Sequence, residues 1–304
     1  MTTAPTARRA RPINPFAPAR PAYVDDLVEV SAAGPVRPRR TLGMVRTDHF
    51  DLRHDELIRL THRVGATDLH AGLAGLLAEE LFGPGWLRGS ELFERILTGI
   101  VLSSRTDPLE AWELFYRNSL REIATATGGE DDSGLHGSIT GYAPVYGHAE
   151  ELLRGDSVLE LGSCFGFFSL RQVATRRVTA VDLSPGTVRL LHTISPRLGP
   201  AVDALTADAA HVPLPDAYAD TVVALHLLEH QDPEHGDRVL ADAIRMARRR
   251  VVVAVPFEDE PEETWGHLRT FNLDDLATWA RHTRLPHDVH EHHGGWLILD
   301  LDRG

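Results

Sequence analysis

Acidic side chains stand at or beside the ends of three successive apolar runs of this sequence. Glu160 lies in the run 158–161, Asp182 follows the run 178–181, and Asp208 follows the run 202–206. Where strands of a parallel sheet end side by side, their polar end groups meet at one edge and can bind a ligand there. An apolar core with ordinary caps explains the strands, but it does not explain a repeated acid at their ends. We therefore interpret the three carboxylates as parts of one binding site.

A loop of small residues, Gly162-Ser163-Cys164-Phe165-Gly166, follows the first of these runs. Gly162 permits a turn that a side chain would block, and Gly166 allows a following helix to approach the strand closely. Asp182 comes twenty residues after Gly162. At this spacing a doubly wound sheet places the carboxylate that accepts both hydroxyls of a ribose. The loop and the acid together predict a ligand that contains a nucleoside.

Strands and helices must alternate to position these residues. Further apolar runs at 221–225 and 251–255 predict two more parallel strands. Between them, Asp232-Pro233-Glu234 predicts the start of a helix, and another helix is expected over about 273–282. The fold class expected is α/β, with a doubly wound and mostly parallel sheet.

The order of these motifs resembles that of class I S-adenosylmethionine-dependent methyltransferases, over roughly residues 145–302. The resemblance implies a seven-stranded Rossmann-like sheet whose last two strands, near 288–290 and 296–301, form an antiparallel pair. It also implies S-adenosyl-L-methionine as cofactor and S-adenosyl-L-homocysteine as product. Glu160 and Gly162 would hold the methionine end, Asp182 the ribose and Asp208 the adenine amino group. The full set of cofactor-binding residues expected from the resemblance is Glu160, Gly162, Ser163, Cys164, Gly166, Asp182, Leu183, Asp208, Ala209, His226 and Tyr146.

Cys164 departs from the family pattern, because a glycine usually occupies its position. Cofactor affinity is the property that this departure puts to the test. Tyr142, Tyr146 and His148 lie in the segment that approaches the cofactor in similar methyltransferases, although ordinary packing of the two tyrosines is an equal alternative.

Histidines follow the last two parallel strands, in loops that open onto the methyl group in this fold. His226 and His230 follow the run 221–225, and His267 follows the run 251–255. A histidine with a pKa near neutrality can accept the proton of an alcohol as the methyl group is transferred. His-x-Arg followed by Phe or Trp recurs here in methyltransferases that act on sugars. His267 and His230 are therefore joint candidates for the general base, ahead of His226.

A narrower resemblance, to the mycofactocin oligosaccharide methyltransferases, rests on the loop motif and on Val255-Pro-Phe-Glu-Asp-Glu-Pro261 with Gly266-His-Leu-Arg-Thr-Phe271. It implies O-methylation of a glucose hydroxyl on an oligoglucosyl chain. The alternatives are a small-molecule O- or N-methyltransferase acting on another natural-product scaffold and a non-catalytic cofactor-binding protein. A nicotinamide-dependent dehydrogenase is a distant third, because its third glycine comes after a different spacing.

No metal site is predicted. A divalent ion could in principle be held by acids of the segment 258–263 and by the histidine-rich segment 290–293, but their spacing fits no defined motif. An acidic lid that hydrogen-bonds a polyhydroxyl acceptor is the preferred interpretation. Zinc is disfavoured, since one cysteine and scattered histidines give no closed tetrahedral set.

Composition excludes several classes of function. The net charge is −13 and all 31 basic residues are arginine, which argues against general nucleic-acid binding. A single cysteine fits a reducing cytoplasm, and no apolar stretch is long enough for a membrane span or a secretory signal. A cytoplasmic protein that acts on a small-molecule or oligosaccharide acceptor is expected, with its oligomeric state left open.

The region before the glycine loop divides into two parts by composition. Residues 1–40 are rich in arginine and proline and poor in large apolar residues, which predicts a disordered leader. Residues 41–134 contain helical periodicities after about residue 50, with helices expected from Asp68, from about Ser90 and from Asp107. They predict a helical cap over the open edge of the sheet. The methyltransferase domain would then occupy residues 135–304.

Overall fold

The computed structural model describes residues 10–37, 39–126, 139–262 and 264–301. Its larger sheet has seven strands in the order β11-β12-β10-β9-β6-β7-β8, and only the pairings of β12 are antiparallel. The strands are β6 (Ser157–Leu161), β7 (Arg177–Asp182), β8 (Asp203–Thr206), β9 (Ala219–Leu225), β10 (Ala247–Val255), β11 (His287–Glu291) and β12 (Gly295–Asp300). The predicted fold class and the final antiparallel pair are both confirmed.

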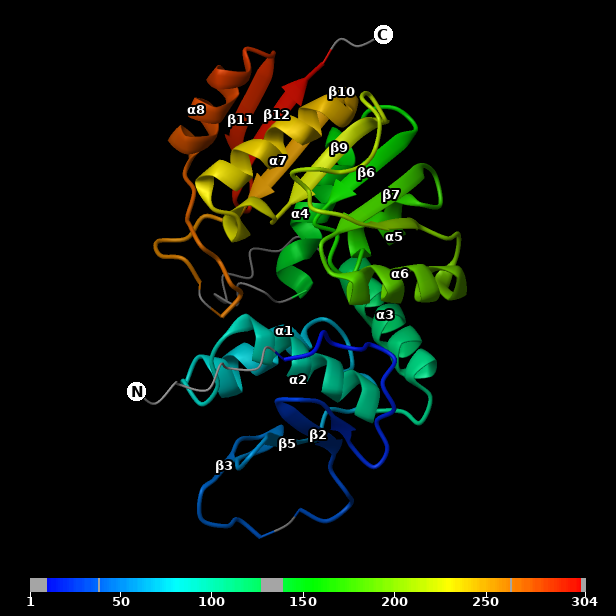
Figure 1. Ribbon diagram of the computed structural model, residues 1–304, viewed down its shortest axis with the longest axis vertical. Coiled ribbons are helices and arrows are strands. Elements are labelled where there is room, and N and C mark those ends of the chain that lie inside the picture. The colour runs from blue at the N-terminus through cyan, green and yellow to red at the C-terminus, as the bar shows by residue number, and fades with distance from the viewer. Residues whose placement is uncertain (1–9, 38, 127–138, 263, 302–304) are drawn as a thin grey trace, which may run out of the picture.

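Helices cover both faces of this sheet (Figure 1). They are α4 (Ile139–Leu152), α5 (Phe167–Gln172), α6 (Pro185–Leu198), α7 (Pro233–Met246) and α8 (Leu273–Thr283), with a short 3-10 helix, η2 (Leu228–His230). Alternate strand residues face opposite layers: Val222 packs in the core with α7 and α8, whereas Val223 packs in the core with α4. This is why the strands read as continuous apolar runs. As predicted, Asp232 caps α7, where its side chain accepts a hydrogen bond from the His235 amide.

The strand order reverses direction at β6, which lies between β7 and β9. Connections leave β6 and β9 toward opposite sides at this point, so a crevice opens beyond the carboxyl ends of the two strands. The glycine-rich loop follows β6, and the first histidine-containing loop follows β9. The topology therefore brings the predicted cofactor and base residues to one edge.

A second sheet occupies the N-terminal part of the chain, which the sequence analysis did not foresee. Its order is β1-β2-β5-β4-β3, built from β1 (Tyr23–Val24), β2 (Val28–Ala32), β3 (Met44–Arg46), β4 (Phe50–His54) and β5 (Ile58–His62). The prediction of a disordered leader is wrong for its described residues, and the region after residue 41 is not purely helical. Composition averaged over forty residues concealed short strands in which buried apolar residues alternate with polar ones, such as Val28 and Val30 in β2. Their pairing partner, β5, lies about thirty residues later in the chain.

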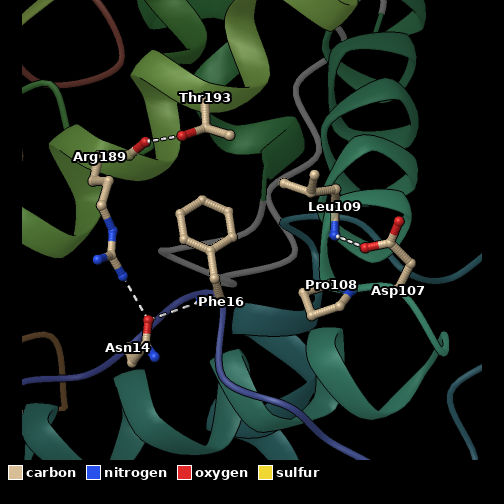
Figure 2. Close-up of a pocket in the computed structure, with 7 residues that line it drawn as sticks. All are labelled: Asn14, Phe16, Asp107, Pro108, Leu109, Arg189 and Thr193. Atoms are coloured by element: carbon tan, nitrogen blue, oxygen red, sulfur yellow. Dashed lines mark hydrogen bonds between the residues drawn. The ribbon is translucent and has the colours of Figure 1, made fainter.

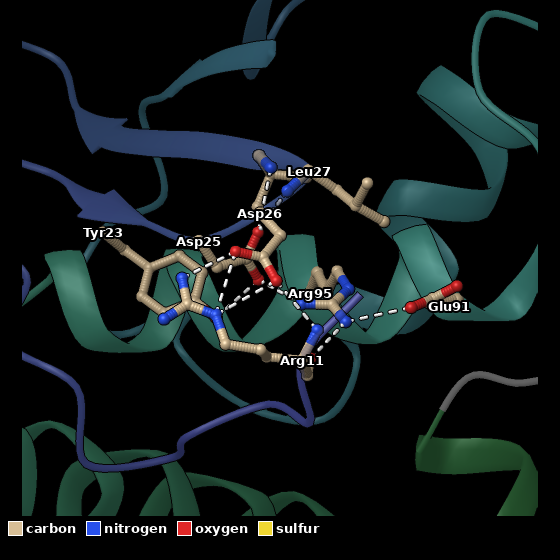
Figure 3. Close-up of polar contacts among 8 residues, drawn as sticks. Arg11, Tyr23, Asp25, Asp26, Leu27, Glu91 and Arg95 are labelled. Carbon is tan, nitrogen blue, oxygen red and sulfur yellow. Dashed lines mark hydrogen bonds and ion pairs between the residues drawn. The ribbon is translucent and has the colours of Figure 1, made fainter. Parts of the chain in front are cut away.

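Polar contacts that centre on the buried Arg95 fasten the leader to α2 (Ser90–Ser103), and an exposed ion pair within the leader adjoins them (Figure 3). Arg95, which is 2% exposed, donates to Asp25 Oδ2 at 2.6 Å and to the carbonyl oxygen of Arg11 at 2.7 Å. The Arg11 side chain in turn pairs with Asp26 at 2.6 Å. Trp112 adds a hydrogen bond from its indole to the carbonyl oxygen of Pro15.

The leader also contacts the larger domain (Figure 2). The guanidinium of Arg189, on α6, lies 5.1 Å from the ring centre of Phe16 and donates to the side chain of Asn14. These residues line a shallow pocket of about 450 Å³ together with Asp107, Pro108 and Leu109. The leader thus contacts both the N-terminal helices and the larger domain and links these two parts of the chain.

Helices α1 (Leu73–Leu77), α2 (Ser90–Ser103) and α3 (Pro108–Thr125), with the π-helix η1 (Ala78–Phe82), follow the small sheet. The helices predicted from Ser90 and Asp107 are confirmed, and the one expected from Asp68 begins later, at Leu73. In Figure 1, α1 and α2 lie between the two sheets. Their buried residues share a core with Phe167, Leu190 and Ile194 of the larger domain. The predicted boundary near residue 134 lies outside the described residues.

Among the described residues, no helix has the length and apolar character needed to cross a membrane.

Candidate active site

The loop after β6 forms a tight turn with three left-handed residues. Gly162, Cys164 and Gly166 have φ values of 70°, 47° and 71°. The turn is closed by a hydrogen bond of 2.7 Å from the Gly166 amide to the carbonyl oxygen of Ser163. Phe165 anchors it to the N-terminal region, with its ring centre 5.4 Å from that of Phe115. Cys164 therefore keeps the backbone shape that a glycine would adopt at its position.

Asp182, at the end of β7, lies directly against this loop. Its Oδ2 accepts a hydrogen bond of 2.8 Å from the Cys164 amide, and its Oδ1 accepts one of 2.9 Å from the Ser184 amide. Burial raises the pKa of Asp182, although both hydrogen bonds favour its ionised form. The next residue, Leu183, is 73% exposed. A fixed carboxylate beside an exposed apolar side chain suits a ribose with its attached base.

Glu160 is the buried acid beneath the loop. It is 5% exposed and accepts hydrogen bonds from the amide and hydroxyl of Ser169, on α5. Burial raises the pKa of Glu160 to about 7, against the effect of the Ser169 hydrogen bonds. Ser169 was not singled out from the sequence. Its spacing of nine residues from Glu160 carries no signal until the turn and helix are formed.

Asp208 and Ala209 follow β8 at the same edge. The Ala207 amide donates to the carbonyl oxygen of Asp182 at 3.1 Å, which places the two strand ends side by side. Asp208 Oδ1 accepts hydrogen bonds from the Ala210 amide and from His235 Nε2, each at 2.9 Å. Partial burial raises the pKa of Asp208, but these hydrogen bonds outweigh it and the net shift is downward.

Aromatic residues on α4 form another wall of the site. Tyr146 packs 5.8 Å from Phe168, and Tyr142 packs 5.1 Å from His226, as measured between ring centres. His226 has a φ of 51°, and its amide donates to the carbonyl oxygen of Ala254 on β10. The third residue suggested for this segment, His148, instead pairs with His290 at 2.8 Å.

The three predicted base candidates gather around one buried carboxylate, Glu229. This side chain is 1% exposed, and among the described residues neither of its oxygens has a hydrogen-bond partner. His226 Nδ1 lies 3.9 Å and His230 Nε2 lies 4.0 Å from its Oε1. Burial raises the pKa of Glu229 to about 8, and the charge of Glu258 adds to this shift.

His267 completes the group from the loop after β10. Its ring centre is 4.8 Å from that of His230, and its Nδ1 lies 2.8 Å from Glu258 Oε2. Burial lowers the pKa of His230, and His267 lowers it further. The sequence placed Glu229 beside His230, but only the turn of η2 shows that the carboxylate points inward.

A pocket of about 590 Å³ opens beside this group. It is lined by Phe257, Glu258, Asp259, Glu260, Glu262, Phe271 and Asn272. Its acids are those that the sequence analysis assigned to an acidic lid. They do not gather with the histidines of segment 290–293 as a metal-ligand group among the described residues.

The N-terminal region closes over the same edge. Trp265 packs 4.9 Å from Phe93 on α2, and the charge of Asp182 contributes, after partial desolvation, to a raised pKa of Glu94 on the same helix. Glu94 had no sequence signal as a site residue, because nothing local relates α2 to β7.

Residues 158–250 match the family model described as a methyltransferase domain. None of the curated proteins compared with the chain matches it. Similar solved structures include S-adenosylmethionine-dependent methyltransferases from three organisms. The protein from Aquifex aeolicus is 18% identical, with 52% of this chain and 87% of that protein aligned and a TM-score of 0.41. The protein from Methanosarcina mazei is 16% identical, with 51% of this chain and 96% of that protein aligned and a TM-score of 0.43. The protein from Archaeoglobus fulgidus is 14% identical, with 51% of this chain and 92% of that protein aligned and a TM-score of 0.41.

Proposed function

We propose that this chain, a class I S-adenosylmethionine-dependent methyltransferase, transfers the methyl group to a sugar hydroxyl, with the oligoglucosyl chain of mycofactocin as the acceptor. The observation that carries the proposal is the position of Glu229, His230 and His267 beside the acidic pocket. Groups able to activate a hydroxyl and groups able to bind hydroxyls lie next to one another there.

The residues at the strand ends fit the cofactor. A Cβ at Gly162 would come within 2.7 Å of the Leu227 side chain, so the loop depends on glycine at this position. Two amides hold the carboxylate of Asp182 in place, which supports its role as acceptor of the ribose hydroxyls, and the exposed Leu183 can offer an apolar surface to the base. When bound, S-adenosylmethionine supplies a methyl group already activated by its sulfonium sulfur. The chain's own task is to orient the acceptor and to remove its proton.

The acidic pocket supports a polyhydroxyl acceptor. Glu258, Asp259, Glu260 and Glu262 offer carboxylate oxygens, which accept hydrogen bonds from sugar hydroxyls. Phe257 supplies an apolar surface against which a sugar ring can lie. An amine acceptor that is neutral when bound would not need a histidine at the reacting atom.

The test is methyl transfer by the purified full-length chain to an oligoglucosylated acceptor. We expect a product heavier by one methylene, detected by mass spectrometry, with the methyl on a glucose oxygen. The same acceptor without its glucosyl units is the control and should not react. Transfer to the aglycone, or to unrelated alcohols and amines in preference to the oligoglucoside, would support the small-molecule alternative instead. Tight cofactor binding without transfer to any acceptor would support a non-catalytic role.

A further inference from the structure

Three potential ligand atoms converge next to the acidic pocket, whose lining residue Glu258 contacts His267. One atom each from Glu229, His230 and His267 lies within 4.8 Å of the other two. The residues come from η2 and from the loop after β10, so two separate segments must fold to bring them together. A spacing of this size leaves room for an ion bound to all three.

Glu229 gives the first reason to expect a cation. Its carboxylate is almost fully buried and lacks a hydrogen-bond partner among the described residues. A buried carboxyl group without hydrogen bonds costs free energy, and proteins ordinarily hydrogen-bond such groups or use them to bind metals. Burial raises the pKa of Glu229, and the charge of Arg269 acts in the opposite direction. No hydrogen bond joins the two among the described residues, since the Arg269 guanidinium stacks on Phe271 and its Nε donates to the carbonyl oxygen of Leu228.

The histidine orientations give a second, independent reason. His267 Nδ1–H donates to Glu258, and His230 Nδ1–H donates to the carbonyl oxygen of Gly266 at 3.3 Å. Both bonds fix the tautomer with the Nε2 lone pair available. Histidines that bind metals characteristically donate their other ring N–H to a carboxylate or a carbonyl oxygen in this way.

We propose that Glu229, His230 and His267 bind one divalent first-row cation, with Mn²⁺ the cation that best suits the acceptor's oxygens. Two imidazoles and one carboxylate leave open coordination positions. The proposal rests on the proposed function for its role: neighbouring hydroxyls of a sugar would fill those positions. The two histidines then act as ligands, which replaces their assignment as general bases.

The cation would activate the hydroxyl directly. It lowers the pKa of the bound hydroxyl, whose proton passes to solvent. The resulting alkoxide oxygen bonds to the methyl carbon as the carbon–sulfur bond breaks, and the sulfur keeps the electron pair as a neutral thioether. No oxidant or further reactant is required.

Cobalt(II) titration of the full-length chain, stripped beforehand with a chelator, tests the site without any acceptor. We expect one bound Co²⁺ per chain with a visible absorption band, and competition by Mn²⁺. Glu229→Gln and His267→Gln should each weaken Co²⁺ binding at least about tenfold. His290→Gln is the matched control, because His290 lies with His148 in a different histidine cluster, and its Co²⁺ binding should be unchanged.

Circular dichroism checks that each variant folds. If either Glu229→Gln or His267→Gln fails to fold, the other variant alone tests the site. Absence of Co²⁺ binding, unchanged binding in both ligand variants, or loss of binding in His290→Gln would overturn the proposal. Methylation of the oligoglucoside that persists in a chelator, without Co²⁺ binding, removes the metal site and leaves the proposed function. Co²⁺ binding without methylation of any sugar would support the metal site and contradict the proposed function.

Discussion

The backbone amide of Cys164 donates a hydrogen bond of 2.8 Å to Asp182 Oδ2. This single contact joins the loop after β6 to the end of β7, across two strands that pair in parallel. It fixes one carboxylate oxygen, while the Ser184 amide fixes the other. The carboxylate that we propose as the ribose ligand is therefore held in place before any cofactor arrives, which would reduce the ordering cost of binding.

Replacing Asp182 should weaken cofactor binding. Asp182→Asn keeps the size of the side chain but removes the charge and one of the two acceptor oxygens. Hydrogen bonds to a charged group contribute about 1.5–3 kcal/mol, so we expect roughly a 10- to 100-fold rise in the Kd for S-adenosylmethionine, measured by calorimetry. Asp203→Asn, at an exposed position at the start of β8, is the control. Equal affinities for the two variants would contradict the assignment of Asp182 to the ribose.

Replacing Cys164 by the glycine that is usual in the family should not weaken cofactor binding. Cys164→Gly keeps the amide that binds Asp182 and removes a Cβ from a residue with φ of 47°. We expect wild-type cofactor affinity, because glycine keeps both the loop conformation and the amide. Folding stability should also change little, because relief of about 1 kcal/mol of left-handed strain is offset by the greater entropy of glycine in the unfolded chain. Cys164→Val should weaken binding, since a β-branched side chain tolerates this conformation poorly. Tighter binding by the valine variant than by the glycine variant would refute this account of the loop.

Gly166 should tolerate no side chain. A Cβ there would lie 2.5 Å from Cδ2 of Leu191, which is 1% exposed, and the residue has φ of 71°. We expect Gly166→Ala to reduce the free energy of unfolding by about 1–3 kcal/mol in urea denaturation. Gly34→Ala is matched to it, because nothing lies within 4 Å of the added atom. Equal stability of the two variants would contradict the close approach of α6 to the loop.

His62 should make the protein sensitive to acid. Burial, aided by the charge of Arg63, lowers the pKa of His62 from 6.5 to about 4. Between these values the unfolded chain binds a proton that the folded chain does not, so stability is present above pH 6.5 and is lost as the pH falls toward 4. The loss is about 2–3 kcal/mol at a pH near 4.5. His62→Gln should lessen the fall in unfolding free energy by this amount, whereas His282→Gln, at an exposed position, should not.

Arg95 should be required for stable attachment of the leader. Its side chain is 3% exposed, and its guanidinium binds the side chains of Asp25 and Glu91 and the carbonyl oxygen of Arg11. Breaking a buried pair costs about 3 kcal/mol, so we expect Arg95→Met to lower the unfolding free energy by that order and to expose the leader to proteolysis. Arg59→Met removes exposed pairs with Glu29 and Asp55 and should cost less than about 1 kcal/mol. Resistance of the leader to protease in Arg95→Met would show that other contacts hold it.

The sequence by itself determined the nucleotide-binding half of the molecule. Continuous apolar runs, a glycine turn and Asp182 at a fixed spacing are local features, and parallel strands bring their ends to one edge whatever the remaining chain does. The parallel strands and the neighbourhood of His226, His230 and His267 could be predicted for this reason, whereas the cofactor-binding residues stay a prediction.

Tertiary structure decided what depends on partners distant in the chain. The strands β1 and β2 form because β5 lies beside β2, and composition near residue 30 contains no trace of that partner. The inward turn of Glu229 and the bond from His267 to Glu258 likewise arise where two loops meet. Burial and pairing are properties of the assembled chain, and they determine which of many acids and histidines are positioned for chemistry.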